Sequence, residues 1–313
     1  MQIPSGKNIF FISDFHLGAP NYVASLEREK IIVQFLEEIK NDAAELFIVG
    51  DMFDFWYEYR QVVPKGYVRL LGKLAELSDA GIPMHFFVGN HDMWMKDYFI
   101  KELNIPVYYK AKEFERNGKK FLIGHGDGLG PGDHGYKRLK KIFRSPACQW
   151  LFGILPPVMG MGLANYLSRR SRIKTGSSEE IFLGEEKEWL ITYCKEVLHQ
   201  KHIDFFVFGH RHLPIDYRLS PITTQLKETG AEVSPRSTPW RGAGGEFSPL
   251  STQLKETGAE VSPLSTPWRG AGGEVPRYIN LGDWIRYYTY AVFDGNNLEL
   301  KSFKGYESKI IRN

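Results

Sequence analysis

The stretch NIFFISDFHLG, residues 8–18, combines the start of a sheet with the start of a polar site. Its first half, Asn8–Ser13, is a short apolar run rich in β-branched and aromatic residues, which is typical of a buried β-strand. Asp14 and His16 follow directly, and Gly18 allows the chain to turn. The stretch therefore predicts a strand whose carboxyl end carries reactive side chains.

The same pattern recurs four times along the chain. Strands are expected at 46–49, 84–88, 120–123 and 205–208, and each is followed by glycine and then by polar residues. The clusters are Gly50-Asp51, Gly89-Asn90-His91-Asp92, Gly124-His125-Gly126-Asp127 and Gly209-His210-Arg211-His212.

Segments with helical spacing lie between several of these strands. They are Leu26–Lys40, Val68–Ala80 and Glu185–Gln200. A further strand is expected at 278–281, and the turn Asp294-Gly295-Asn296-Asn297 joins a closing hairpin of 288–293 and 298–303. This alternation predicts an α/β fold with strands covered by helices on both faces.

Composition points to an ordinary folded protein. The chain has 313 residues, a formal net charge of +3, 42% hydrophobic and 25% charged residues. The balanced charge does not suggest a general nucleic-acid binder. Two cysteines are too few for a disulfide framework and favour a reducing compartment. No signal peptide or long apolar run is evident, so we expect a cytoplasmic protein.

A near-identical repeat means that the folded domain is smaller than the length of the chain suggests. Residues 220–246 recur at 248–274 with three differences. The copies are rich in Ser, Thr, Pro and Gly and lack the apolar pattern of a solenoid, which predicts a duplicated flexible insertion over 220–275. The remaining residues have the size of a single domain, which we expect to span 1–313 with this insertion. Alternatively, the duplicated insertion could serve as an arm that binds a partner.

The five polar clusters are expected to meet, because the carboxyl ends of strands in open α/β sheets line a common crevice. Oxygen and imidazole ligands together suit Mn²⁺, Fe²⁺ or Zn²⁺. Taken singly, each residue could be a turn Asp or a hydrogen-bonded His. Together they predict two ions that share a carboxylate, as in phosphoryl transfer. The candidate ligands are Asp14, His16, Asp51, Asn90, His125, His210 and His212.

The ordered motifs D-x-H, G-D, G-N-H-[DE], G-H and G-H-x-H resemble those of the calcineurin-like metallophosphoesterases, from Asp14 to His212. The resemblance implies a four-layer α/β/β/α sandwich and a hydrolase with two divalent ions. It implies one ion on Asp14, His16, Asp51 and His212, and the other on Asp51, Asn90, His125 and His210.

The resemblance also implies roles in catalysis. Water activated by the ions would attack phosphorus, and protonated His91 would stabilise the developing charge or assist the leaving group. Asp92 would orient His91, although a helix-capping role explains Asp92 equally well.

Within that family, three segments resemble the UDP-2,3-diacylglucosamine hydrolases of lipid A synthesis. They are Asp14–Gly18, the G-D-x-F-[DE]-x-W element at 50–56, and Leu281-Gly282-Asp283-Trp284. The resemblance implies cleavage of a lipid-linked nucleotide to UMP and 2,3-diacylglucosamine 1-phosphate, with Mn²⁺ as the expected metal. The best-known branch has Arg where this chain has His91. A phosphoesterase for soluble nucleotides, phosphoproteins or nucleic acid therefore stays open as the alternative, whereas a scaffold without chemistry would be expected to lack ligands.

The segment 135–176 interrupts the α/β pattern and is expected to form a helical lid insertion. Its apolar centre has basic flanks, which suits either a lid over acyl chains at an anionic membrane surface or a plain helical cap. On the first interpretation the protein is peripheral on the inner face of the membrane. The residues expected to contact substrate are Arg169, Arg170, Arg172, Lys174 and Trp56, with core packing as the alternative for Trp56.

Overall fold

The computed structural model describes residues 1–131, 134–175, 181–219 and 275–313. The duplicated insertion predicted over 220–275 lies outside the described residues, apart from its last residue. All described residues belong to one compact unit, Met1–Ser220 with Trp268–Asn313.

The first of two six-stranded sheets has the strand order β11-β10-β1-β2-β3-β4. The first four strands in the chain run parallel, and β10 pairs antiparallel with β1, so that Ile9 lies opposite Phe293. The strands are β1 (Asn8–Ile12), β2 (Ala43–Val49), β3 (Met84–Phe87), β4 (Val107–Tyr108), β10 (Thr289–Phe293) and β11 (Leu298–Ser302).

The second sheet has the order β12-β8-β9-β7-β6-β5 and is also mixed. Strands β6, β7 and β9 are parallel, whereas β5 pairs antiparallel with β6 and β8 pairs antiparallel with β9; β12 pairs parallel with β8. The strands are β5 (Lys112–Arg116), β6 (Lys119–Ile123), β7 (Phe205–Phe208), β8 (Pro214–Arg218), β9 (Arg277–Leu281) and β12 (Ile311–Arg312).

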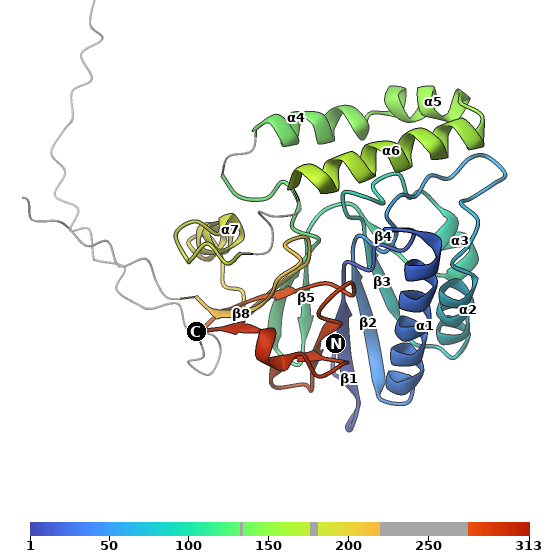
Figure 1. The fold of residues 1–313 in the computed structure, drawn as a ribbon. Helices are drawn as coiled ribbons and strands as arrows, with labels where there is room; N and C mark the ends of the chain where they lie inside the picture. The colour runs from blue at the N-terminus through green and yellow to red at the C-terminus, as the bar shows by residue number, and fades with distance from the viewer. Residues whose placement is uncertain (132–133, 176–180, 220–274) are drawn as a thin grey trace, which may run out of the picture. The chain divides into compact units, whose positions relative to one another are not determined.

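Alternating side chains stack the two sheets against each other. In β1, Phe10 and Ile12 face the helices, whereas Ile9 and Phe11 face the second sheet. Helices α1 (Tyr22–Ile39) and α2 (Val68–Asp79), together with the short α3 (Tyr98–Leu103), cover the first sheet. Helix α7 (Trp189–Leu198) covers the second sheet from the opposite side (Figure 1). The expected four-layer α/β/β/α sandwich is confirmed.

The ends of the predicted helices shift where local interactions decide them. Helix α1 begins at Tyr22 rather than Leu26, because Asn21 caps it by accepting a hydrogen bond from the Ala24 amide. Helix α7 begins at Trp189 rather than Glu185, because the preceding residues form a turn. The short strands β4, β5, β8 and β12 and helix α3 were not predicted, since none has a long periodic pattern.

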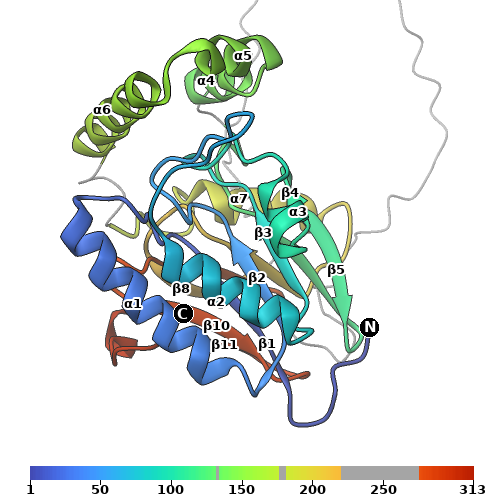
Figure 2. The same cartoon turned by 90° about the vertical axis from the view of Figure 1, so that its right-hand side faces the viewer.

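Three helices lie within the predicted 135–176 insertion. They are α4 (His134–Phe143), α5 (Pro146–Ile154) and α6 (Pro157–Thr175), and we refer to 134–175 as the three-helix insertion. Figures 1 and 2 show it lying across one end of the sheets. It packs on the body through a small aromatic cluster of Tyr57, Trp94, Phe152 and Ala164.

Candidate metal centre

The backbone of the candidate ligands is unusual. Five of them adopt the left-handed conformation that non-glycine residues rarely take, with φ from 45° to 71°. They are Asp14, His16, Asp51, His210 and His212. Such strain persists only where surrounding structure enforces it, and it is concentrated at functional sites.

Two glycines let the loops of the centre approach each other. A Cβ on Gly50 would lie 2.4 Å from Nδ1 of His125, and one on Gly209 would lie 2.0 Å from Oγ of Ser13. Neither contact is physically possible, so a side chain at either position would push apart the loops that carry the ligands.

The first candidate group consists of Asp14, His16, Asp51 and His212, whose potential ligand atoms lie close together. Nε2 of His16 is 3.6 Å from Oδ1 of Asp14 and 3.7 Å from Oδ2 of Asp51. Nε2 of His212 is 3.4 Å from the same Asp14 oxygen and 3.1 Å from Nε2 of His16. Two oxygens and two ring nitrogens thus face one small space.

The second candidate group shares Asp51 and adds His125 and His210. Nε2 of His125 lies 3.3 Å from Oδ2 of Asp51 and 3.1 Å from Oδ1 of Asn90. The rings of His125 and His210 lie side by side, with centroids 5.2 Å apart. Asp51 therefore stands between the two groups, and all seven predicted ligands belong to one cluster.

The other ring nitrogen of each of three histidines faces a fixed acceptor. Nδ1 of His125 donates to the carbonyl oxygen of Val49 at 2.8 Å. Nδ1 of His16 lies 3.8 Å from Asp54, and Nδ1 of His212 lies 3.7 Å from Asp283. The His125 hydrogen bond is of the kind that orients histidine ligands in metal sites and leaves Nε2 for the ion, whereas the His16 and His212 distances are longer than a hydrogen bond.

The carboxylates also fit a cation. Oδ2 of Asp14 accepts the His210 amide at 3.0 Å, and Oδ1 of Asp51 accepts the His91 amide at 2.8 Å. Their second oxygens, Oδ1 of Asp14 and Oδ2 of Asp51, are buried without a hydrogen-bond partner and point into the cluster. Buried carboxylate oxygens are normally paired, so this donor set suits two divalent ions bridged by Asp51.

Burial and the same carboxylates also set the pKa values of the histidines in the cluster. Burial lowers the pKa of His16, but Asp14, Asp54 and Asp51 outweigh it and raise that pKa to about 10. For His125, Asp51 likewise outweighs burial and raises the pKa to about 10. Burial lowers the pKa of His210 to about 4 and that of His212 to about 3. Without an ion, protons on two histidines neutralise the buried carboxylates, a task that a cation would take over.

His91 stands at the edge of the centre, with its ring centroid 4.8 Å from that of His16. Its Nδ1 donates to the carbonyl oxygen of Asp54 at 2.9 Å and lies 3.6 Å from Oδ1 of the same residue. Asp54, not Asp92, therefore orients His91, and the expectation for Asp92 was wrong. The Asp92 carboxylate accepts the amides of Gly89 and Met52, at 2.7 Å and 2.9 Å, and ties two loops together.

Comparison with known proteins agrees with this geometry. The family model described as calcineurin-like phosphoesterase matches residues 7–214, which include all seven candidate ligands. The chain belongs to the calcineurin-like phosphoesterase family. Membership makes it a metal-dependent hydrolase, in agreement with the two ligand groups.

Relatives within the family carry a more specific name. A UDP-2,3-diacylglucosamine hydrolase of Porphyromonas gingivalis is 33% identical over 96% of this chain and 99% of the relative. One of Histophilus somni is 29% identical over 70% of this chain and 90% of the relative. The solved phosphoesterase Yfce from E. coli covers 96% of this chain and 94% of its own, with a TM-score of 0.39 and 14% identity.

The predicted substrate contacts have mixed outcomes in this phosphoesterase. Trp56 is fully buried, stacks on Phe53 at 4.4 Å and donates to Glu58, so it serves core packing and the expected ligand contact was wrong. Arg170 is exposed on α6 and donates to the Tyr166 hydroxyl. The side chains of Arg169, Arg172 and Lys174 lie outside the described part of the chain.

Sequence reasoning did not assign site roles to Asp54, Asp127 and Asp283. Each is buried, and each lies close to a predicted ligand in space. A signal was present, because Asp54 and Asp283 occur in the 50–56 and 281–284 segments, and Asp127 follows His125 by two positions. Only the fold could show what each carboxylate faces.

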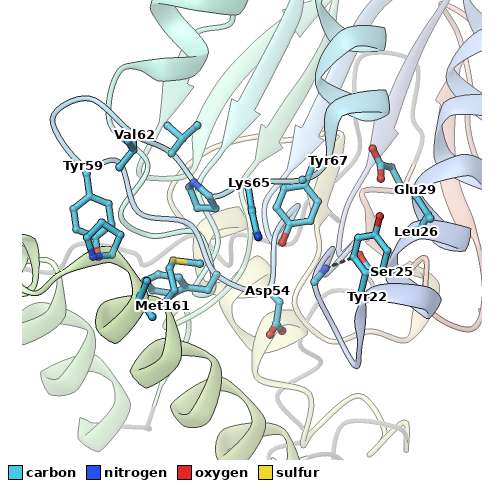
Figure 3. A pocket seen from close by; sticks show the side chains of 17 residues that line it. Tyr22, Ser25, Leu26, Glu29, Asp54, Tyr59, Val62, Lys65, Tyr67 and Met161 are labelled. Atoms are coloured by element: carbon cyan, nitrogen blue, oxygen red, sulfur yellow. Dashed lines mark hydrogen bonds between the residues drawn. The ribbon is translucent and has the colours of Figure 1, made fainter.

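A groove of about 570 Å³ opens beside the metal centre. Figure 3 shows Asp54 at its floor, Tyr22 and Tyr67 toward α1, and Met161 on α6 at the other side. Most of the lining is apolar, from Leu26, Val62, Val63, Pro64, Pro157, Val158 and Met161. The phosphoesterase site therefore continues into a surface suited to a hydrocarbon chain.

Proposed function

We propose that this phosphoesterase hydrolyses the pyrophosphate bond of UDP-2,3-diacylglucosamine, giving UMP and 2,3-diacylglucosamine 1-phosphate. The observation that carries the proposal is the apolar groove that reaches Asp54, next to two ligand groups that share Asp51. The names of the relatives support the same substrate.

The chain's own residues have distinct tasks in this reaction. Bound divalent ions, for which we propose Mn²⁺, supply Lewis acidity and neutralise phosphate charge. The seven ligands hold the ions. His91, fixed through Nδ1 by Asp54, is left with Nε2 to hold a proton toward the leaving oxygen. Arg170 is exposed beside the site and is proposed to contact phosphate, together with Arg169, Arg172 and Lys174.

The exposed apolar surface of α5 and of the start of α6, which we call the exposed face of the insertion, supports a lipid substrate. Trp150, Leu151, Ile154, Val158 and Met159 are 59–86% exposed, although they are large and apolar. Contiguous exposed apolar side chains mark an interaction surface. Exposed Arg138, Lys141 and Arg170 provide basic charge on the same insertion.

This face is proposed to dip into an anionic membrane surface at the cytoplasmic side, as interfacial helices do. Among the helices that the structure describes, none is long and apolar enough to cross a membrane. The protein is proposed to reach its lipid as a peripheral protein, with no nucleic-acid partner.

The test compares two substrates with purified, Mn²⁺-loaded protein. We expect turnover of UDP-2,3-diacylglucosamine in mixed micelles to exceed that of bis(p-nitrophenyl) phosphate by at least about a hundredfold in kcat/KM. His91→Ala should reduce both activities, because each needs the same leaving-group assistance. Good diesterase activity without cleavage of the lipid nucleotide would overturn the substrate assignment and favour a soluble phosphoester.

A deletion separates the metal centre from the lipid site. Replacing residues 135–176 by a short Gly-Ser linker removes the α6 side of the groove and the exposed apolar face. Lipid turnover should then be lost, while bis(p-nitrophenyl) phosphate turnover and metal content persist. Equal loss of both activities would argue against a substrate-specific role of the insertion.

A further inference from the structure

One hydrogen bond joins the three-helix insertion to the catalytic edge of the metal centre. Oγ of Ser168, on α6, donates to Oδ2 of Asp54 at 2.9 Å. The same hydroxyl lies 3.5 Å from Nδ1 of His91. Asp54 is only 5% exposed, so this contact forms where bulk water does not compete.

Different atoms of Asp54 contact the insertion and the histidines. Its Oδ2 accepts from Ser168, whereas Oδ1 faces Nδ1 of both His91 and His16, at 3.6 Å and 3.8 Å. Its carbonyl oxygen accepts from His91. A rotation of the Asp54 side chain would therefore move the charged oxygen that lies near both imidazoles, while the carbonyl oxygen that accepts from His91 would stay in place.

The first two helices of the insertion bury few of their own side chains, so the position of the insertion can change more easily than that of the sheets. Helix α4 has no buried residue, and Phe152 is the one buried residue of α5. Tyr136 and Lys140 fasten α4 to Asp127, with the tyrosine hydroxyl 2.7 Å from the carboxylate. Segments with so few buried contacts open more readily than the core.

A ligand in the groove would affect the position of α6, because α6 forms one side of the groove. Asp54 lines it from the body, while Pro157, Val158 and Met161 line it from α6. A hydrocarbon chain in the groove would touch both sides and favour the position in which Ser168 reaches Asp54.

We infer that Ser168 is a positioning residue that couples the position of α6 on the body to the orientation of His91 through Asp54. The inference rests on the proposed function for its consequence, because a lipid in the groove would align His91, whereas a small diester would not. It makes the three-helix insertion a determinant of turnover as well as of binding.

The contact itself is tested without any substrate. Protein labelled with ¹³C- and ¹⁵N-histidine and loaded with Zn²⁺ gives ring signals, and the one missing in His91→Ala identifies His91. Ser168→Ala should shift or broaden that signal, while Ser168→Thr, which keeps the hydroxyl, should resemble the wild type. The matched control is Leu163→Ala, at a position of the same helix that is 45% exposed. A His91 signal unchanged in Ser168→Ala would overturn the inference, whatever the substrate is.

The consequence is tested by kinetics on two substrates. Ser168→Ala should lower kcat on UDP-2,3-diacylglucosamine about tenfold with KM within twofold. It should lower kcat on bis(p-nitrophenyl) phosphate by a clearly smaller factor, because that diester also uses His91 but does not fill the groove that favours the Ser168 contact. Metal content and melting temperature should match the wild type. An equal fall on both substrates, or a change in KM alone, would contradict the coupling. Absence of lipid turnover in the wild type would instead contradict the proposed function, and the histidine spectra would still decide the contact.

Discussion

Four of the seven candidate ligands of the metal centre are buried and the other three are half-buried, whereas the three-helix insertion beside it exposes most of the large apolar side chains that the structure describes there. The centre is bound to both sheets by strained loops and by hydrogen bonds to backbone amides. The insertion rests on one small aromatic cluster and on several hydrogen bonds, most of them from residues that are only half-buried. The difference indicates that the candidate ligands are fixed by the core of the fold, whereas the insertion, to which we propose to assign substrate recognition, can adjust more easily.

The bridging carboxylate should give the largest effect. Asp51→Asn keeps the shape but removes the charge shared by the two ligand groups, so we expect at least a thousandfold loss of turnover on any phosphoester and less than one tightly bound ion per chain. Elemental analysis and kinetics measure this, with exposed Asp79→Asn as the control. Retention of both ions would show that Asp51 does not bridge them.

The second largest effect is expected at the buried ion pair that holds the loop of His210 and His212 in place. Arg211 lies between His210 and His212 and makes two hydrogen bonds to Glu188, at 2.8 Å and 3.0 Å, and both residues are at most 1% exposed. Glu188→Gln removes the carboxylate charge that faces this buried guanidinium, which should lower the free energy of unfolding by about 3 kcal/mol. Urea unfolding measures it. A loss below about 1 kcal/mol would mean that this loop is less tightly held than the comparison requires.

Acidity should weaken ion binding to the centre. The pKa of His16 and that of His125 lie at about 10 in the metal-free protein, so both imidazoles carry a proton at neutral pH. An ion needs the neutral ring and must displace these protons, so affinity should rise with pH, by about tenfold per unit for each proton released. Titration with Mn²⁺ at pH 7 and pH 8, in buffers of different ionisation enthalpy, measures both quantities. A flat affinity with no proton release would refute the assigned charge states.

The exposed face of the insertion should give the smallest effect. Trp150→Gln with Ile154→Gln removes two large apolar side chains that are 67% and 59% exposed, and binding to vesicles of anionic phospholipid should weaken about fivefold. Turnover of bis(p-nitrophenyl) phosphate should stay unchanged. Ile100→Gln, on α3, is the matched control at 49% exposure. Equal effects of the two variants would assign the binding to general hydrophobicity instead of this face.

Much of the site could be predicted because its ligands follow short buried strands. The run Asn8–Ile12 is followed directly by Asp14 and His16, and Phe205–Phe208 by His210 and His212. Strand propensity and parallel pairing bring such ends together whatever the details of the loops. Trp56 and Asp92 could not be assigned in this way, because the direction of a side chain in a loop depends on which neighbours fill the space around it.

The sequence by itself determined the α/β character, the seven candidate ligands and the expectation that they meet, since these depend on periodicity and on residues adjacent to strand ends. Only the tertiary structure decided that Asp54 orients His91, that Trp56 is core, and that Ser168 on a distant helix reaches the same carboxylate. Contacts between segments as far apart as Asp54 and Ser168 leave no local pattern, because they arise from how loops and helices pack after the sheets have formed.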